Sequence, residues 1–274
     1  MNGFLLSPRG ITSCALRAYG IVQATAETLP ALRKHPGSPD GVAMPANLLN
    51  HVDDQTVVAL AAVLRAIDSF QLKKQDFRKW GVVGSPRFAG RRSFNVSLDK
   101  FQRQGPLSVS PLVIPFLSLH AVSSLISLAL HIHGPAIGVG GGDGEFVQAL
   151  LMGLALQQQQ ELPGVWVVAT GWNPDPVAEC GASAEAQPVC QAAALALLPH
   201  GADAPGPRLR LVPTDGHDAA LRGPPSLPDL MQFLSSASTT NAARTWCCPL
   251  PGNCRLELEA GMVVQDVSLL ARSA

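Results

Sequence analysis

The chain has 274 residues, of which 47% are hydrophobic and 15% charged, and its formal net charge is zero. A neutral chain has no general electrostatic attraction for nucleic acid or for an anionic membrane, so neither is expected as a partner. The length suffices for a large buried core. A composition that is this apolar and this poor in charge also indicates that another subunit covers part of the surface.

The sequence carries no clear targeting, membrane or metal-binding signal. Met1–Leu6 lacks the basic and apolar regions of a secretory signal. The apolar stretch 110–132 contains two prolines and two histidines, which favours a buried helix over a membrane span. Cys247, Cys248 and Cys254 lie close in sequence, but adjacent cysteines fit a zinc tetrahedron poorly and no fourth ligand follows at a familiar distance. We therefore expect a cytoplasmic protein with reduced thiols, no metal and no cofactor.

The first half of the chain alternates between apolar segments and glycine- or proline-rich turns. Asp53 precedes a run that is apolar nearly all round, as in a helix that is buried on several sides. The segment 87–92 is a basic, glycine-containing loop. The predicted elements are a strand within 10–28, a helix over 56–67, a strand over 80–84, a polar helix over 97–104 and a core helix over 118–131.

The stretch 134–157 is the most distinctive part of the sequence. Gly134-Pro135 precedes an apolar strand over 136–139, three glycines follow, and a helix begins near Gly144. Glycines allow the chain to turn sharply and to approach other groups closely. Asp143 would lie at the N-terminus of this helix, where free N–H groups and the helix dipole favour an anion.

The second half of the chain favours strands. The loop 171–190 is rich in proline, alanine and glycine and is interpreted as an insertion. The tail predicts a final hairpin turned at Ala260-Gly261. Strands that alternate with helices are typical of a mixed α/β domain. The remaining predicted elements are strands over 164–170, 192–198 and 209–213, the last two as antiparallel neighbours, and a helix over 227–236.

The order of these features resembles the N-terminal half of β-ketoacyl-ACP synthases, the condensing enzymes of the thiolase fold. In that family a nucleophilic cysteine caps the helix after the glycine turn, and counting from Gly134-Pro135 places its position on Asp143. The resemblance covers roughly residues 50–235 and implies a thiolase-like α/β fold, with a mixed sheet and helices on both faces. It is carried by Trp80-Gly-Val-Val-Gly84, Ser110-Pro-Leu-Val-Ile-Pro115, the core helix, Gly134-Pro135 and the strand, turn and helix that follow.

Two departures from the family distinguish this chain from an active enzyme. Residue 143 is an aspartate, whose acyl derivative would be an anhydride unstable to water, and the neighbouring Gly141, Gly142 and Gly144 carry no thiol. The chain also ends where the family's second half would begin, so the two histidine motifs and the lysine of that half have no counterpart. The resemblance therefore implies a non-catalytic, half-length subunit, similar to chain length factors of aryl-polyene-like and other type II polyketide or fatty-acid systems.

Such a subunit would pair with an active ketosynthase, associate with itself, or bind an acyl carrier protein. A lone first half leaves one apolar face of the fold without its usual cover, so either residues 190–270 fold back over that face or a second chain covers it. In the family the strand before the turn pairs across the dimer, which makes Ile137, Gly138 and Val139 candidate interface residues. We expect a single domain over 1–274, with its core at about 50–235 and a hairpin extension at 250–270.

The candidate residues also have ordinary structural interpretations. Asp143 fits a helix N-cap, and its three preceding glycines fit a tight crossing better than a nucleotide site. Arg87, Arg91 and Arg92 would either receive an acidic carrier protein or lie on a solvated loop.

The histidines near the core helix are interpreted in the same way. His131 and His133 fit partners of a helix C-terminus or buried polar groups better than metal ligands. His120 fits a core histidine whose hydrogen bonds are satisfied.

Two other functions remain open. Gly141-Gly-Asp-Gly-Glu145 resembles the nucleophile turn of α/β-hydrolases in its aspartate form, with Asp143 as nucleophile and Glu145 in place of the last glycine. His200 and His217 are the downstream candidates for the base in that reaction. The third interpretation is a free-standing protein that holds an acyl chain in the former pocket.

Overall fold

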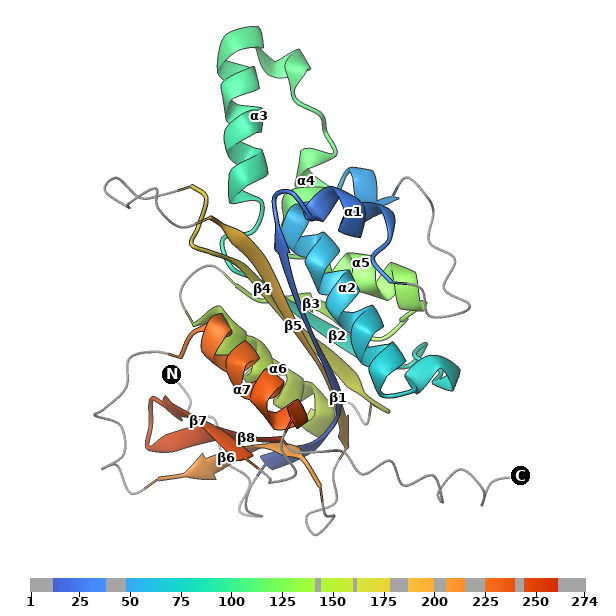
Figure 1. Cartoon of the computed structure of the whole chain (residues 1–274), viewed down its shortest axis with the longest axis vertical. Helices are drawn as coiled ribbons and strands as arrows, with labels where there is room; N and C mark the ends of the chain where they lie inside the picture. The colour runs from blue at the N-terminus through green and yellow to red at the C-terminus, as the bar shows by residue number, and fades with distance from the viewer. Residues whose placement is uncertain are drawn as a thin grey trace.

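The computed structural model describes residues 12–37, 48–140, 144–159, 162–177, 187–199, 206–214, 225–239 and 244–260. Within them runs an eight-stranded sheet in the order β3-β2-β4-β5-β1-β6-β8-β7 (Figure 1). The strands are β1 (Thr12–Thr25), β2 (Gly81–Pro86), β3 (Ala136–Gly138), β4 (Val165–Asn173), β5 (Val189–Pro199), β6 (Arg208–Pro213), β7 (Arg244–Leu250) and β8 (Cys254–Ala260).

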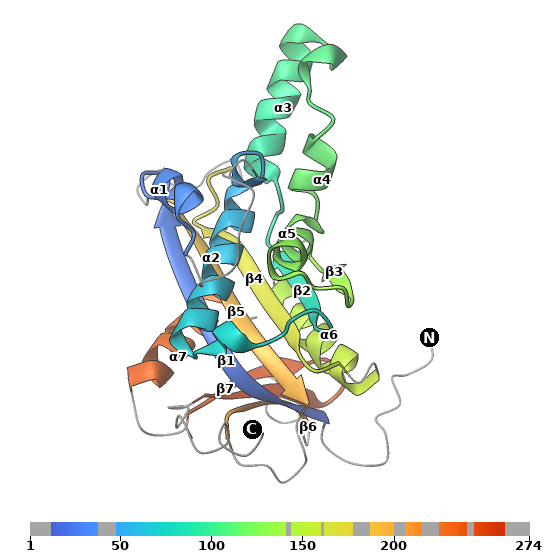
Figure 2. The same cartoon turned by 90° about the vertical axis from the view of Figure 1, so that its right-hand side faces the viewer.

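Helices cover both faces of this sheet (Figures 1 and 2). One face carries α2 and α5, and the other carries α6 and α7. The fold is therefore mixed α/β with helices on both faces, as the sequence predicted. The helices are α1 (Leu29–Lys34), α2 (Asp54–Ser69), α3 (Arg91–Gln104), α4 (Val113–Leu117), α5 (Ala121–Leu130), α6 (Glu145–Gln159) and α7 (Leu227–Thr239), with short 3₁₀ turns η1 (Leu48–Asn50), η2 (Leu72–Lys74) and η3 (Pro106–Ser108).

The centre of the sheet combines parallel and antiparallel pairs. Strand β2 lies parallel to both β3 and β4, whereas β5 runs antiparallel to its neighbours β4 and β1. All of β2 and the first eight residues of β4 are buried. Such nearly continuous apolar strands are expected where helices cover both faces.

Helix α2 packs directly onto the sheet. Asp53 is its N-cap and accepts a hydrogen bond from the Gln55 N–H at 3.1 Å, which satisfies one of the free donors of the first turn. Twelve of the sixteen residues of α2 are buried, which confirms the prediction of a helix buried on several sides. A Cβ on Gly20 of β1 would lie 2.1 Å from the Ala62 carbonyl oxygen, so this glycine is what allows the close approach.

The opposite face is covered by the chain's own C-terminal segments. Leu230, Met231 and Leu234 of α7 are buried beside α6 in one apolar cluster. The hairpin β7–β8 continues beneath these helices, and Trp246 of β7 lies 6.1 Å from Phe146 of α6 between ring centroids. The described segments after residue 190, α7 and the hairpin β7–β8, therefore cover part of this face.

Two predicted pairings in the second half were wrong. Strands β5 and β6 are not neighbours, because β1 lies between them and pairs with both. The final hairpin turns at 251–253 rather than at Ala260-Gly261, and joins β7 to β8. Gly252 and Asn253 both have positive φ there, and Pro-Gly-Asn is a stronger turn sequence than Ala-Gly. Gly261 and the second strand expected after it lie outside the described residues.

The polar helix predicted over 97–104 begins earlier, at Arg91, so the segment 87–92 is a turn and a helix start rather than a loop. The apolar stretch 110–132 forms the two short helices α4 and α5. Within the described ranges, the helices fall short of the length and apolarity needed to cross a bilayer.

Candidate functional site

The turn between β3 and α6 is where the sequence places Asp143. On one side the Val139 N–H donates to the Gly84 carbonyl at 2.8 Å, directly after β3. On the other side Gly144, with φ of +77°, precedes the first turn of α6. Asp143, Gly141 and Gly142 lie outside the described residues, so their predicted roles remain predictions.

A cavity of about 160 Å³ lies beside the N-terminus of α6. Its walls are formed by the first residues of α6, the carboxyl end of β4 and the segment that begins α7. The volume equals that of about five molecules of liquid water, so it fits a small polar or short apolar group. The lining residues are Arg87, Gly144, Glu145, Phe146, Ala169, Thr170, Gly171, Trp172, Asn173, Gln191, Pro225, Ser226, Leu227 and Pro228.

A buried polar network supports the cavity wall from the α2 side. The Gln55 Nε2 donates to the Arg87 carbonyl at 2.8 Å, and the Thr170 hydroxyl donates to Gln55 Oε1 at 2.9 Å. The Arg87 N–H in turn donates to the Thr170 carbonyl at 2.8 Å. Gln55 and Thr170 are 3% and 1% exposed, and a satisfied network at such depth holds one backbone geometry. Sequence reasoning missed these residues, although a glutamine in an otherwise apolar helix is a visible signal.

Gln191 places an amide on the floor of the cavity. Along β5, Cys190 and Ala192 belong to the apolar cluster under α2, whereas Ala193 and Leu195 belong to the cluster under α6 and α7. Because side chains alternate along a strand, Gln191 points to the face of α6 and α7, where the cavity lies. Its neighbour Cys190 points to the opposite face.

The charged groups of the cavity are of both signs. Arg87 and the nearly buried Glu145 both line it. At the start of α7, Ser226 N–H and Oγ donate to Asp229 Oδ2 at 2.9 and 2.6 Å, and these bonds lower the pKa of Asp229. The Asp229 N–H donates back to Ser226 Oγ at 3.3 Å, which is a reciprocal cap for this helix.

The three buried thiols among the described residues are not suited to nucleophilic chemistry. Burial raises the pKa of Cys14 to about 12 and that of Cys248 to about 11, and it raises the pKa of Cys190 well above the ordinary value. A thiol rather than a thiolate is therefore present at neutral pH in each case, and the thiolate is the nucleophile. Among the described residues, the cavity is lined by neither cysteine nor histidine.

Two of the three arginines proposed to receive a carrier protein are engaged within the chain. Arg91 lies 3.2 Å from Asp175, and Arg92 lies 3.3 Å from Asp54. The Arg92 guanidinium also lies over the Trp172 ring at 5.5 Å. These contacts neutralise both side chains and fix the start of α3 against α2 and the end of β4.

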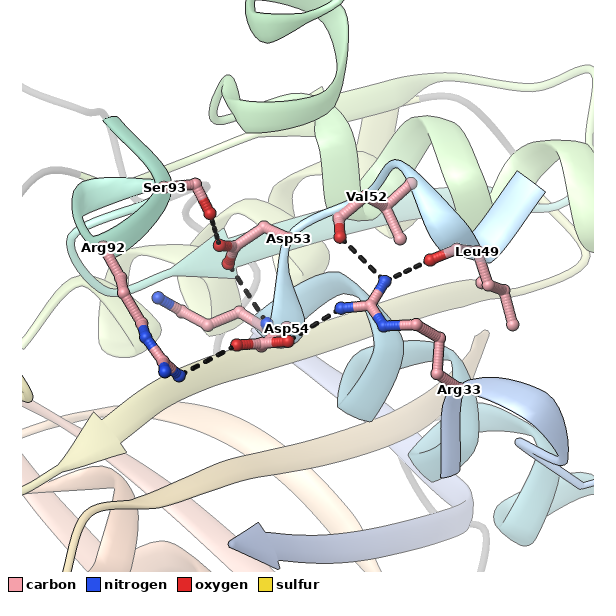
Figure 3. Close-up of polar contacts among 8 residues, drawn as sticks. Arg33, Leu49, Val52, Asp53, Asp54, Arg92 and Ser93 are labelled. Carbon is pink, nitrogen blue, oxygen red and sulfur yellow. Dashed lines mark hydrogen bonds and ion pairs between the residues drawn. The ribbon is translucent and has the colours of Figure 1, made fainter. Parts of the chain in front are cut away.

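The acidic pair Asp53 and Asp54 lies at the centre of this junction (Figure 3). Ser93 Oγ donates to Asp53 Oδ1 at 3.3 Å, while Asp54 lies between Arg92 and Arg33, the latter at 2.7 Å. Arg33 also donates to the backbone carbonyls of Leu49 and Val52. Burial raises the pKa of Asp53, against the lowering effect of the bond from the Gln55 N–H.

The histidine predictions were partly right. His131 is the C-cap of α5 in the left-handed conformation and is exposed, as expected for a residue at a helix C-terminus. His133 is exposed just beyond it. His120 is exposed at the N-terminus of α5, so the prediction of a core histidine was wrong. In the part of the chain that the structure describes, histidine, cysteine and acidic side chains form no group of three that could hold a metal.

The candidate interface strand lies at the end of the sheet. Strand β3 pairs with β2 on one side only and is the first strand in the sheet order. Ile137 and Val139 are partly buried against the cluster under α6. An edge strand presents main-chain donors and acceptors that another chain can pair with, so the position is compatible with the predicted role.

Neither a scan against protein-family models nor a search of curated proteins gave a match. Among solved structures, the chain is similar to a ketosynthase in complex with its chain length factor from Xenorhabdus doucetiae, with 14% identity and a TM-score of 0.55. That match covers 89% of this chain and 98% of the other, so the two chains are of similar length.

Two further matches have TM-scores of 0.49. The ishigamide ketosynthase/chain length factor is 16% identical, over 76% of this chain and 69% of that one. A type II PKS acyl-carrier protein in complex with its ketosynthase bound to the hexaketide is 13% identical. That match covers 68% of this chain and only 62% of the other. Similarity at such low identity shows the fold alone, and the fold is the ketosynthase-like one that the sequence predicted.

Proposed function

We propose that the chain is a non-catalytic, ketosynthase-like subunit that pairs with an active β-ketoacyl synthase in type II polyketide or fatty-acid biosynthesis, in the manner of a chain length factor. The observation that carries the proposal is the cavity beside α6. The resemblance locates a nucleophile at position 143, directly before this cavity, where the sequence has aspartate. The described lining offers an amide, a guanidinium and a carboxylate, but neither thiol nor imidazole.

The cover over the cavity supports the same proposal. In this chain α7 lies beside α6, and the segment 225–228 forms part of the cavity wall. The described lining of this cavity holds neither a thiol nor an imidazole that could carry out condensation. Condensation would then take place on the partner, while this subunit contributes shape and contact surface. We include Ile137, Gly138 and Val139 on the open edge of the sheet in the proposed contact with that partner.

The decisive experiment is co-expression of the chain with any β-ketoacyl synthase encoded near its gene, followed by size exclusion with light scattering. The proposal expects a stable complex of the two chains and condensing activity with acyl carrier protein substrates that depends on the cysteine of the ketosynthase. Asp143→Asn in the present chain should leave that activity intact. A monomeric chain that binds neither the ketosynthase nor the carrier protein would contradict the proposal.

The same material tests the other two functions. An aspartate-nucleophile hydrolase would cleave esters or haloalkanes in the absence of any partner, and Asp143→Asn would abolish that activity. A free-standing acyl-binding protein would retain acyl chains that native mass spectrometry detects. Either result with the purified chain alone would replace the proposed function.

A further inference from the structure

A helical arm projects from one end of the fold. The arm, residues 91–117, comprises α3, η3 and α4, and it extends beyond the sheet and the other helices (Figures 1 and 2). None of the fourteen residues of α3 is buried. A helix with no buried face gains little from tertiary packing within its own chain.

The arm carries most of the exposed apolar surface. Of the large hydrophobic side chains that are exposed in the described residues, all but Leu128 of α5 lie on it. Their exposed fractions add up to about four whole side chains, which at roughly 150 Å² each is on the order of 600 Å² of apolar surface. A standard protein interface buries about 800 Å² per partner, somewhat more than half of it apolar, so the arm supplies the apolar part of one such interface. The residues are Phe94, Val96, Leu98, Phe101, Leu107, Leu112 and Ile114.

The distribution of these side chains indicates the shape of the partner. At 100° per residue, Phe94, Leu98 and Phe101 form one stripe on α3, whereas Val96 lies on the opposite side. Leu107 is fully exposed in η3, at the far end of α3, and Ile114 is 76% exposed on the returning helix α4. An arm that is apolar on several sides is covered only inside a groove. A second arm of the same convex shape would cover one side and leave the rest in water.

The charges of the arm argue against an acidic partner such as a carrier protein. Arg91 and Arg92 are paired with acidic residues of the body, and Arg103 lies 2.8 Å from Asp99 on α3 itself. Lys100 is a further exposed cation of α3, so the arm offers an apolar surface with little free positive charge rather than a strongly cationic one. Desolvation of apolar area is then the main source of affinity.

The base of the arm is fixed and adjoins the open edge of the sheet. Ser93 and Arg92 bind the acidic pair at the start of α2 (Figure 3). A Cβ on Gly138 of β3 would lie 2.5 Å from the carbonyl oxygen of Leu119, which follows α4. The edge strand and the arm base are therefore parts of one continuous surface, and a chain that meets β3 is placed to receive the arm.

We propose that the arm inserts into an apolar groove of the ketosynthase partner and is the main source of binding affinity in the complex. This inference rests on the proposed function, because it takes the same partner as its occupant. The arm is already ordered by its base, so little conformational entropy remains to be lost on binding. Charges introduced into the apolar stripe would have to be desolvated in the groove and would oppose binding.

The test uses the full chain and the ketosynthase found to form the complex proposed above, with the dissociation constant measured by calorimetry. The double variant Leu98→Asp/Phe101→Asp should weaken the complex by at least about 30-fold, as expected for hot-spot residues. The matched control, Gln102→Asp/Gln104→Asp, places the same charges on exposed polar positions of α3 and should change the affinity by less than about 3-fold. Circular dichroism and the midpoint of thermal unfolding verify that both variants fold, which the lack of buried residues in α3 leads us to expect.

The outcomes separate this inference from the proposed function. The stripe variant is Leu98→Asp/Phe101→Asp. If it binds the ketosynthase as tightly as the wild-type chain does, the inference is overturned and the proposed function stands. Failure of the wild-type chain to bind the ketosynthase would overturn the proposed function and the inference with it. A homodimer of the isolated chain that the stripe variant abolishes would assign the arm to a second copy and overturn the inference. A photo-crosslinker at position 101 that labels the ketosynthase would support it.

Discussion

Helices α2 and α3 are of similar length but have opposite environments. Twelve residues of α2 are buried between the sheet and α5, whereas α3 has no buried residue although it carries Phe94, Leu98 and Phe101. The difference is that α2 packs against β1, β4 and β5, while α3 is held at its base by ion pairs and hydrogen bonds. Apolar residues in α2 therefore stabilise the fold, and those in α3 are available to stabilise a complex.

The largest expected effect comes from truncating one leucine in each helix and comparing the two losses of stability. Leu60 of α2 is fully buried, so Leu60→Ala should reduce the free energy of unfolding by about 2–5 kcal/mol. Leu98 of α3 is 55% exposed, so Leu98→Ala should change it by no more than about 0.5 kcal/mol. Urea unfolding of the isolated chain measures both values. Similar losses for the two variants would mean that α3 is packed within the isolated chain.

A smaller effect is expected where α2 touches the backbone of β1. Gly20→Ala would place a methyl group 2.1 Å from the Ala62 carbonyl oxygen, and α2 must shift to accommodate it. We expect a loss of about 1–3 kcal/mol in urea unfolding, in the range of overpacked cores. Gln23→Ala, at an exposed position of the same strand, is the control and should be nearly neutral. If Gly20→Ala is as stable as the wild-type chain, α2 can shift away from β1 without loss of stability.

The N-cap of α2 should give an effect of about 1 kcal/mol and a dependence on pH. Asp53→Ala removes the acceptor for the Gln55 N–H, which costs about 1 kcal/mol at a typical N-cap. Because burial raises the pKa of Asp53, the folded state holds its proton more tightly than the unfolded state does. That contribution to stability is complete below the unfolded pKa near 3.9 and is lost as the pH rises through the higher folded pKa.

Asp53→Asn isolates the pH dependence, since it retains an acceptor without the titrating charge. The stability of this variant relative to wild type should increase as the pH is raised from about 4 towards neutrality. Urea unfolding at several pH values measures the difference. A constant difference would show that the carboxyl titrates alike in the folded and unfolded chains.

The sequence predicted most of the first half because its signals are local. The apolar run after Asp53 is long enough to identify a buried helix, and the glycine turn before Gly144 separates strand from helix without ambiguity. The position of β1 between β5 and β6 was not predictable in this way, since pairing between distant strands leaves no local pattern. The Pro-Gly-Asn turn at 251–253 is a local signal that the sequence analysis missed.

The candidate site was predictable only in outline. The sequence identified the turn before α6, but the cavity depends on Gln55, Thr170 and Gln191, which lie on α2, β4 and β5. These residues come together through the sheet order, which the sequence pattern did not contain. The exposure of the arm was not predictable from the sequence either. The sequence predicts a polar helix over 97–104, and only the structure shows that the helix begins at Arg91 and leaves Leu98 and Phe101 exposed.

The smallest expected effect concerns the base of the arm. Arg92 pairs with Asp54 across the junction, but its side chain is 48% exposed, so Arg92→Ala should lower the stability by less than about 1 kcal/mol. If base contacts rather than burial hold α3, amide hydrogen exchange in α3 should nevertheless become faster, while exchange in the buried α2 stays slow. Arg103→Ala is the matched control, because its partner Asp99 lies within α3 and the pair makes no contact with the body. Equal exchange rates in both variants would mean that the remaining base contacts, from Arg91 and Ser93, suffice to hold the arm. Helix α3 would then be anchored firmly although it is not buried as α2 is.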